Sequence, residues 1–430
     1  MNQPTPRAAH GWAHAFLAVV AGLLAMVVVA ALGLWAAGAA DLPDGAFPRV
    51  VTATVMTAVG GSVKISGDAG FLAETRAGLT VIPLSVTLTG ALVIAAGFLR
   101  PLRHRAVAGA RELAGWAARV GVVWLLLLIL LCVVARQQFA VSLGEGTLGD
   151  IGDILDTQPK VGFEADWFDT LVFGLLWLAG VLILALLVSR GAPLPARLLR
   201  FQTSVRPAAY AMVVLLLAYV AGGVVIGLVV AGTRGHAEET FAVLLLGLPN
   251  LVWLAFTLGL GASWEGQVEG PFGLPMPHVL DQVLRTGDLS TLNVSTLAER
   301  DGRWWWLVVV AAVLVLAAAF VMAARSPART RWWQHSAHMA VALVLTVLMV
   351  CLVCRISARF GLSLLGLGDA GGALSGHLVL RPRFWGALGL AALWGLATGA
   401  LGGLLAARVR HRGEVQLGKG AGAGAGQRVD

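Results

Sequence analysis

Eight long apolar stretches with almost no charged residue inside them recur along the chain. They cover residues 13–38, 79–99, 116–135, 170–189, 208–231, 304–324, 337–354 and 384–407. An α-helix needs about 20 apolar residues to cross roughly 30 Å of hydrocarbon. A transmembrane β-barrel would instead show segments of about ten residues that alternate polar and apolar positions, and no such alternation dominates. The pattern predicts an all-α, polytopic transmembrane helical bundle of eight spans.

A ninth apolar run, residues 240–262, is long enough to span but carries Pro249 and Asn250 at its midpoint. A proline at the centre of a span removes a backbone donor and bends the helix. We therefore predict two half-helices, joined at Pro249 and Asn250, that dip into the membrane and return to the same side. A simple kinked helix, which would give nine spans, is the alternative.

The composition fits a membrane protein: of 430 residues, 58% are hydrophobic and 13% are charged, against roughly 25% charged in ordinary soluble domains. The net charge of +8 comes from basic residues in short loops at the ends of the apolar stretches. Because these residues do not form one soluble surface, no nucleic-acid partner is expected. The first stretch exceeds the apolar region of about 7 to 15 residues in a secretory signal, so we interpret it as an uncleaved first helix.

The positions of the arginines set the expected orientation. Residues 100–115 and 190–207 each hold four arginines, and three more follow the last span, so these segments are predicted to be cytoplasmic. Residues 136–169 carry seven acidic residues and are predicted to be external. Both termini are then cytoplasmic, in a multi-pass protein of a bacterial cell (inner) membrane. The acidic loop 263–303 is predicted to be external too, which favours the re-entrant version of 240–262.

The two halves of the sequence are alike in the order of their elements. Each starts with a long helix and a short apolar element, at 47–59 in the first half and 240–262 in the second, before three further spans. Four crossings per half give both halves one orientation, as in a parallel repeat about an axis along the membrane normal. Chance likeness between Gly- and Leu-rich segments is the alternative. The predicted organisation is a cytoplasmic N-terminus at 1–12, four-span halves at 13–200 and 201–412, and a flexible cytoplasmic tail at 413–430.

Three strings of residues carry a resemblance to a known family. They are Gly-Gly-Ser-Val-Lys-Ile-Ser-Gly-Asp at 60–68, Ile-Pro-Leu-Ser-Val at 82–86 and Leu-Gly-Leu-Pro-Asn-Leu-Val-Trp-Leu at 246–254. With these strings the chain resembles the streptophobe family, strongly hydrophobic integral membrane proteins of Streptomyces and relatives, from the first helix to Arg412. The resemblance implies no activity, no cofactor and no functional residue.

The apolar stretches are almost empty of ionisable side chains, which disfavours proton-coupled transport, because such transporters keep costly charges inside the membrane for function. The motifs H-E-x-x-H, G-x-S-x-G and G-x-x-x-x-G-K-[ST] do not occur in the sequence. The chain therefore lacks the usual catalytic groups of metalloproteases, of hydrolases with a nucleophile elbow and of P-loop enzymes. Asp369 ends a G-x-G-D string but has no second intramembrane aspartate to share a proton with. Cys351 and Cys354 form a C-x-x-C without further metal ligands. No enzymatic activity, cofactor or metal is expected.

Glycines recur three or four residues apart in the last stretch, at Gly395, Gly399, Gly402 and Gly403. This spacing predicts close helix packing rather than a pore.

The partial elements are the best candidates for a binding site, because the ends of half-helices direct partial charges and free backbone groups at one buried point. The residues predicted to line it are Gly60, Gly61, Ser62, Pro249 and Asn250. Our preferred interpretation is a non-enzymatic membrane protein with a structural, accessory or lipid-interacting role. Its partner is the lipid bilayer, with a further membrane protein or a second copy of the chain left open. The alternative is a transporter or channel for a small neutral or lipid-like solute, using partial helices at 47–61 and 240–262.

Overall fold

The helices of the computed structural model match the eight apolar stretches. The structure describes residues 11–41, 46–61, 63–68, 73–104, 110–135, 137–140, 160–165, 167–189, 196–233, 235–268, 290–327, 331–364 and 376–422. The long helices are α1 (Gly11–Ala36), α3 (Leu84–Leu99), α4 (Ala110–Ala135), α6 (Trp167–Val188), α7 (Ala196–Thr233), α12 (Trp306–Arg325), α13 (Trp332–Val353) and α14 (Phe384–Gly422). Seven of them are long and apolar enough to cross a membrane, and α3, with 16 residues, is shorter. The predicted polytopic helical bundle is confirmed, and the chain is a multi-pass membrane protein.

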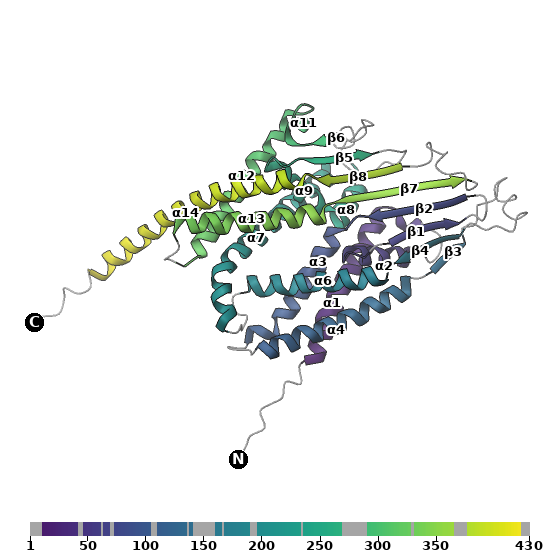
Figure 1. Ribbon diagram of the computed structural model, residues 1–430, viewed down its shortest axis with the longest axis horizontal. Helices are drawn as coiled ribbons and strands as arrows, with labels where there is room; N and C mark the ends of the chain where they lie inside the picture. Colours follow the sequence, from purple (N-terminus) through teal and green to yellow (C-terminus); the bar gives the residue numbers. More distant parts are fainter. Residues whose placement is uncertain are drawn as a thin grey trace, which may run out of the picture.

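Eight strands form one antiparallel sheet at one end of the bundle (Figure 1). The strands are β1 (Val63–Asp68), β2 (Ala73–Thr80), β3 (Gln137–Ala140), β4 (Lys160–Ala165), β5 (Trp264–Val268), β6 (Ser290–Leu292), β7 (Ile356–Leu364) and β8 (Gly376–Pro382). They follow the order β3-β4-β1-β2-β7-β8-β5-β6. The central pair, β2 with β7, runs from Ala73 opposite Leu364 to Thr80 opposite Ser357. This pair joins the two halves of the chain. None of these strands was predicted from the sequence, and the predicted span 79–99 included the last two residues of β2.

Exposed tryptophans mark two levels along the bundle. Near the sheet they are Trp35, Trp305, Trp306 and Trp385, and at the opposite end they are Trp12, Trp332 and Trp333. Trp and Tyr are enriched at membrane–water interfaces. On α1, the residues from Trp12 to Trp35 extend for about 35 Å at 1.5 Å per residue, slightly more than the roughly 30 Å of a hydrocarbon layer. The two levels therefore fit the two faces of a membrane.

The sheet determines the side on which each helix begins. The pair β1–β2 leads from α2 (Ala46–Ala58) into α3, β3–β4 joins α4 to α6, and β7–β8 joins α13 to α14. Because β5 lies in the same sheet, the chain must be back at the sheet end after α7. Since α7 begins at the end away from the sheet, an odd number of crossings must lie between its start and β5. The α7 helix supplies one crossing, so the segment between α7 and β5 begins and ends on the sheet side. With the shorter α3 counted, the described helices pass eight times between the sheet end and the opposite end, and α1 begins and α14 ends away from the sheet (Figure 1).

The same order of elements occurs in both halves. Each half has a long helix, a short helical element, a strand pair, two helices, a second strand pair and a closing helix. The sheet repeats this correspondence, since β3-β4-β1-β2 of the first half is followed by β7-β8-β5-β6 of the second. Each half also has its own apolar core. One core is built from α1, α2, α3, α4 and α6, and the other mainly from α7, α9 (Leu248–Gly259), α12, α13 and α14.

Glycines bring the last helices into close contact. A Cβ added at Gly395 or Gly399 would meet backbone atoms of α13, and one at Gly402 would meet backbone atoms of α12 at Ala319. A Cβ at Gly403 would lie 3.2 Å from the ring of His335. The predicted packing role of these glycines is confirmed. The last helix also continues past the predicted boundary at 412, to Gly422.

Candidate functional site

The ninth apolar run forms a sharp elbow. Its two helices, α8 (Ala237–Leu246) and α9 (Leu248–Gly259), meet at Gly247 with a bend of 76°. The predicted pair of half-helices is therefore present, although the break lies before Pro249 rather than at it. Proline is well tolerated in the first helical turn, where its missing N–H has no intrahelical partner to lose. Pro249 accordingly lies in the first turn of α9, and the topology of the sheet makes the elbow re-entrant.

Asn250 joins the elbow to the first half of the chain. Its Oδ1 accepts a hydrogen bond from the backbone N–H of Leu84 at 3.1 Å, and its Nδ2 donates to the carbonyl of Ile82 at 3.0 Å. The N–H groups of a first helical turn lack intrahelical partners, so the Asn250 amide satisfies one at the start of α3. Both polar groups of the Asn250 amide are therefore hydrogen-bonded to the protein backbone.

Ser85 makes a second polar contact across the halves. Its hydroxyl donates to the carbonyl of Leu244 at 2.9 Å. In an unbroken helix that carbonyl would accept from the amide four residues later, at Leu248. Ser85 therefore supplies a donor for a carbonyl near the end of α8.

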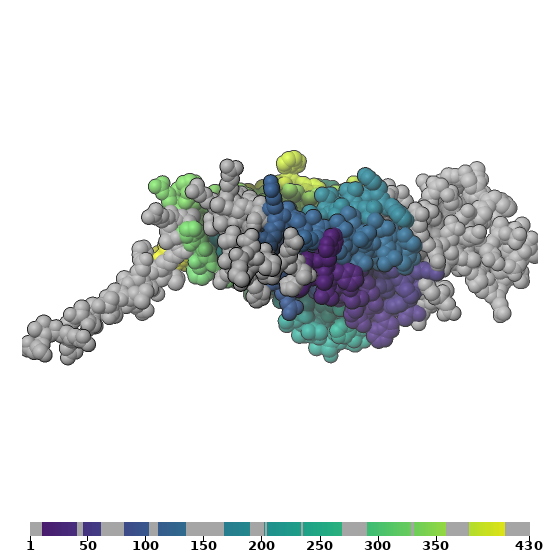
Figure 2. Space-filling model, turned by 90° about the horizontal axis from the view of Figure 1, so that it is seen from below, coloured from purple at the N-terminus to yellow at the C-terminus, as the bar shows by residue number. Residues whose placement is uncertain are grey.

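Close glycine contacts surround the elbow. A Cβ added at Gly33 of α1 would lie 2.7 Å from Leu246, and one at Gly227 of α7 would lie 2.5 Å from Leu244. A Cβ added at Gly223, one turn before Gly227, would lie 2.5 Å from Val252 and 2.9 Å from Leu248, both of α9. The elbow thus lies in a seam between α1 and α3 of the first half and α7 of the second. Figure 2 shows the purple surface of α1 bordering a teal-green surface of the second half.

The elbow lies towards the sheet side of the membrane. At the opposite end of the bundle, the Arg325 guanidinium lies 3.8 Å above the Tyr210 ring. Leu248 lies against Gly223, which is about 20 Å further along α7 than Tyr210 at 1.5 Å per residue. In a hydrocarbon layer of roughly 30 Å, this position is in the sheet-side third. The bend at Gly247 therefore lies towards the sheet side, while α9 reaches deeper into the bundle, where Trp253 Nε1 donates to the carbonyl of Leu216 at 3.2 Å.

The short helices α2 and α9 end in the same kind of turn. Gly60 follows α2 with a φ of +93°, and Gly261 follows α9 with a φ of +91°. The closing hydrogen bonds run from Gly61 N to Met56 O at 2.9 Å and from Ala262 N to Thr257 O at 3.0 Å. A left-handed residue followed by such a bond is a Schellman motif, in which glycine avoids the steric cost of a positive φ. These glycines therefore have a conformational role.

The predicted site residues divide into two groups, the glycines that follow α2 and the residues Pro249 and Asn250 of the elbow. Gly61 faces α6, because a Cβ there would lie 2.8 Å from Thr170 Oγ1, and Ser62 is outside the described residues. Thr87 of α3 donates to the carbonyl of Ala58 at 2.6 Å, while Asn250 holds Leu84 on the same helical turn. The first turn of α3 thus lies between the two groups.

Sequence reasoning missed Ser85 and the glycines that surround the elbow. Gly223 and Gly227 are four residues apart on α7, and this small-xxx-small spacing is the signal that could have identified the contact with the elbow. Ser85 lies in an otherwise apolar stretch, and its partner is a backbone carbonyl 159 positions away. No local pattern indicates such a partner.

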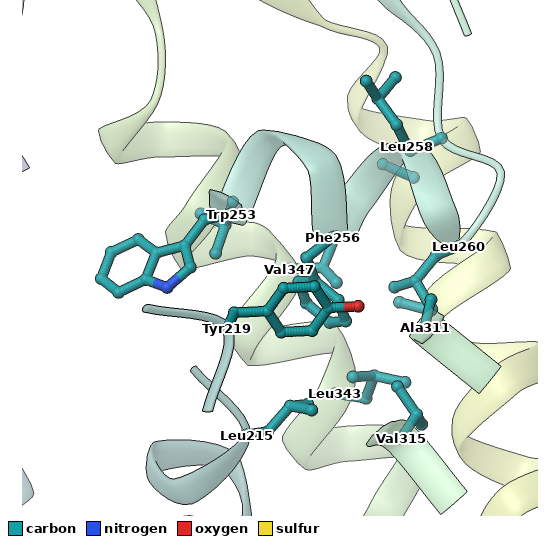
Figure 3. Close-up of a cluster of buried hydrophobic side chains, with 14 of the residues drawn as sticks. Leu215, Tyr219, Trp253, Phe256, Leu258, Leu260, Ala311, Val315, Leu343 and Val347 are labelled. Carbon is teal, nitrogen blue, oxygen red and sulfur yellow. The ribbon is translucent and has the colours of Figure 1, made fainter. Parts of the chain in front are cut away.

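Tyr219 brings a hydroxyl into the apolar core beside α9. Its ring packs on Phe256 with centroids 5.0 Å apart, and its oxygen points towards Leu260 and Ala311 (Figure 3). Among the residues that the structure describes, this buried hydroxyl has no hydrogen-bond partner. A buried donor without a partner costs about 1–3 kcal/mol.

We expect Tyr219→Phe to leave the thermal stability unchanged or to raise it, by up to about 1–2 kcal/mol, because the ring stays and only the desolvated hydroxyl is lost. Thermal unfolding of the detergent-solubilised protein measures this. Tyr210→Phe is the control, since Tyr210 is only partly buried and its ring keeps the contact with Arg325. A clear loss of stability in Tyr219→Phe would show that the hydroxyl has a partner after all.

The remaining candidate chemistry is limited. The three cysteines, Cys132, Cys351 and Cys354, are buried and form no disulfide with one another. Within the described ranges, no group of three or more His, Cys, Asp or Glu residues could hold a metal ion. An exposed ion pair, Arg383 Nε to Glu265 Oε1 at 2.7 Å, ties the start of α14 to β5 outside the helices. In comparisons with known proteins, no family model, no curated protein and no solved structure matches the chain.

Proposed function

We propose that this protein is a non-enzymatic structural component of a membrane, whose bundle holds an eight-stranded sheet against one membrane face. The observation that carries the proposal is the filled elbow. The polar atoms of the Asn250 side chain bind the backbone at Ile82 and Leu84, and leucines of α8 and α9 fill the glycine positions of α1 and α7. A transport path would need polar groups free to face a solute. Here the polar side chains at the elbow are hydrogen-bonded to the protein backbone.

We further propose that the sheet lies outside a bacterial inner membrane and that both termini are cytoplasmic. Arg325 and Arg331 are exposed at the end of the bundle opposite the sheet, and cytoplasmic loops are the ones enriched in Lys and Arg. The arginine-rich sequence after α3 supports the same orientation.

An origin by duplication of a four-span unit is also proposed. In its favour are the shared order of elements, the shared strand order and the matched turns at Gly60 and Gly261. The contacts of these glycines correspond as well, since an added Cβ would meet Phe173 of α6 at 3.1 Å or Leu390 of α14 at 3.6 Å. Membership of the streptophobe family rests on the three sequence strings alone and stays a proposal.

A flux measurement tests the structural role against the transporter alternative. The protein is reconstituted into vesicles of phosphatidylethanolamine and phosphatidylglycerol, and their swelling in glycerol and urea is followed by stopped-flow light scattering. We expect the same permeability as in protein-free vesicles, because protein groups fill the elbow. Faster swelling that Asn250→Leu abolishes would contradict the proposal and support a solute path at the elbow.

A further inference from the structure

The sheet has two edges, and they belong to different halves of the chain. In the order β3-β4-β1-β2-β7-β8-β5-β6, the outermost strands β3 and β6 each pair with a single neighbour among the described residues. Figure 1 shows them at opposite sides of the sheet. A sheet edge presents N–H and C=O groups that can pair with another extended segment. Each edge is therefore a potential pairing site for a further strand.

The two halves pair their strands in the same register. Val63 of β1 lies opposite Leu79 of β2, and Trp264 of β5 lies opposite Leu292 of β6. Val63 and Trp264 each come three residues after the left-handed glycine of the preceding turn. The same two residues also pair with the strand that leads into the closing helix of their half, β4 or β8. The strands β1, β2 and β4 therefore correspond to β5, β6 and β8.

The remaining strands, β3 and β7, correspond as well. The first residue of β3, Gln137, lies opposite Phe163 of β4, and the first residue of β7, Ile356, lies opposite Leu380 of β8. Phe163 and Leu380 each lie two residues before the partner of Val63 or Trp264. Gln137 therefore corresponds to Ile356.

This correspondence shows what the two edges match. Inside the chain, the halves are joined by β2 and β7. The counterpart of β2 is β6, and the counterpart of β7 is β3. The outer edge of β6 thus corresponds to the edge of β2 that pairs with β7, and the outer edge of β3 corresponds to the edge of β7 that pairs with β2. The two outer edges are complementary to each other in the way the internal pair is.

The backbone of Thr291 is directed out of the β6 edge. The N–H of Arg383 donates to the carbonyl of Ser263 at 3.0 Å, so Ser263 directs its backbone groups towards β8. Successive residues of an antiparallel strand direct these groups to alternate sides. Trp264 therefore faces β6, and its partner Leu292 faces β5. The preceding residue, Thr291, then directs its N–H and C=O away from β5.

The helices below the sheet show the same relation. Fully buried residues recur at the same intervals in two corresponding helices, namely Val86, Ile94 and Phe98 in α3 and Ala311, Ala319 and Ala323 in α12. In this alignment Ser85 corresponds to Val310. Ser85 contacts α8 across the boundary between the halves, whereas Val310 is 42% exposed. The face of α12 that corresponds to this boundary is thus uncovered within the described part of one chain.

We propose that a second copy of the chain continues the sheet, with its β3 paired antiparallel to β6 as β7 is paired to β2. Gly78 lies opposite Arg359 in the internal pair, and the counterparts of these residues are Thr291 and Ala140. Thr291 of one copy then lies opposite Ala140 of the next. Because every copy lies in the same membrane, the copies are related by rotation about the membrane normal and form a closed ring or an open row.

This assembly goes beyond the structural role proposed above. The strands β3 and β6 have only four and three residues, and short isolated strand pairs are marginally stable in water. Packing of the exposed apolar face of α12 on the second copy is therefore part of the proposal.

Cross-linking tests the pairing. The variants T291C and A140C are mixed in detergent, reconstituted together into vesicles of phosphatidylethanolamine and phosphatidylglycerol, and treated with a short bismaleimide. Opposite residues of an antiparallel pair lie about 4.5–5.5 Å apart between Cα atoms, so we expect roughly tenfold more covalent dimer in the mixture than in either variant alone. The native protein, whose cysteines are buried, is the control. Equal dimer in T291C alone would indicate pairing of β6 with β6 and would overturn the proposal.

Thr291 also provides a matched pair of variants. Thr291→Pro removes the outward N–H and leaves the bonds between β5 and β6 in place, as proline at an edge allows. Thr291→Ala keeps this N–H. Photobleaching steps of protein labelled at the C-terminus count the copies in each assembly. We expect Thr291→Pro to weaken association about fivefold, the factor for one hydrogen bond of roughly 1 kcal/mol, and Thr291→Ala to leave it unchanged.

Two results would contradict the assembly. One is equal association of Thr291→Pro and Thr291→Ala, which would show that the β6 edge takes no part. The other is a native protein that stays single at every protein-to-lipid ratio tested. Either result would leave the structural role intact, because the flux measurement does not depend on the number of copies.

Discussion

Gly395→Ala should destabilise the protein by about 3 kcal/mol, at the upper end of the usual cost of overpacking. The added methyl group would meet the Cα of Ala340 and would lie 2.8 Å from its backbone nitrogen. Backbone atoms cannot move aside as a flexible side chain can, so α13 and α14 must separate. We expect the thermal midpoint in detergent to fall by about 3–6 °C, using about 1–2 °C per kcal/mol for a chain of this length.

Gly389→Ala is the matched control for this prediction. Gly389 lies in the same helix, and an added Cβ there meets nothing within 4 Å. Alanine is also favoured over glycine in a helix by up to about 1 kcal/mol. The control should therefore be as stable as the native protein or slightly more so. Equal losses in the two variants would mean that the α13–α14 contact is looser than described.

Asn250→Leu should cost about 2–4 kcal/mol. The substitution keeps the size of the side chain but leaves the N–H of Leu84 and the carbonyl of Ile82 without this partner in apolar surroundings, and each such group costs about 1–3 kcal/mol. Because the bonds join the two halves, the loss should appear as a lower midpoint of unfolding in a denaturing detergent.

Thr89→Ala serves as the comparison for Asn250→Leu. Its hydroxyl bonds the carbonyl of Ser85 within α3, so its loss leaves the contact between the halves intact. We expect less than about 1 kcal/mol for it. If Asn250→Leu were as stable as Thr89→Ala, the Asn250 amide would not be the link between α9 and α3.

The spans could be predicted from the sequence because a membrane imposes one requirement on each of them, a long apolar run. The sheet could not, for an equally physical reason. Its strands are short, β3 with four residues and β6 with three, and β1 and β2 carry glycine and charged residues that resemble loop sequence. Their stability depends on pairing between distant segments, such as β2 with β7. No local pattern contains that information.

The elbow was predictable in kind but not in detail. Pro249 and the charge of the following loop pointed to a broken, re-entrant element, and the structure has one. The residue at the bend is Gly247 instead, because proline fits the first turn of α9. That Asn250 would bind the start of α3 depends on the packing of the two halves. Whether the five predicted residues bind a ligand remains a prediction.

The pairing of β2 with β7 has a consequence for synthesis. About 280 residues separate Thr80 from Ile356. Because chains grow at about 5–20 residues per second, β7 is synthesised roughly 15–55 s after β2. During this time the first half presents an eight-residue strand with one free edge. Such an edge can pair with any extended segment, including the β2 of a neighbouring nascent chain. The yield of correctly assembled protein should therefore fall when translation of the second half is slowed.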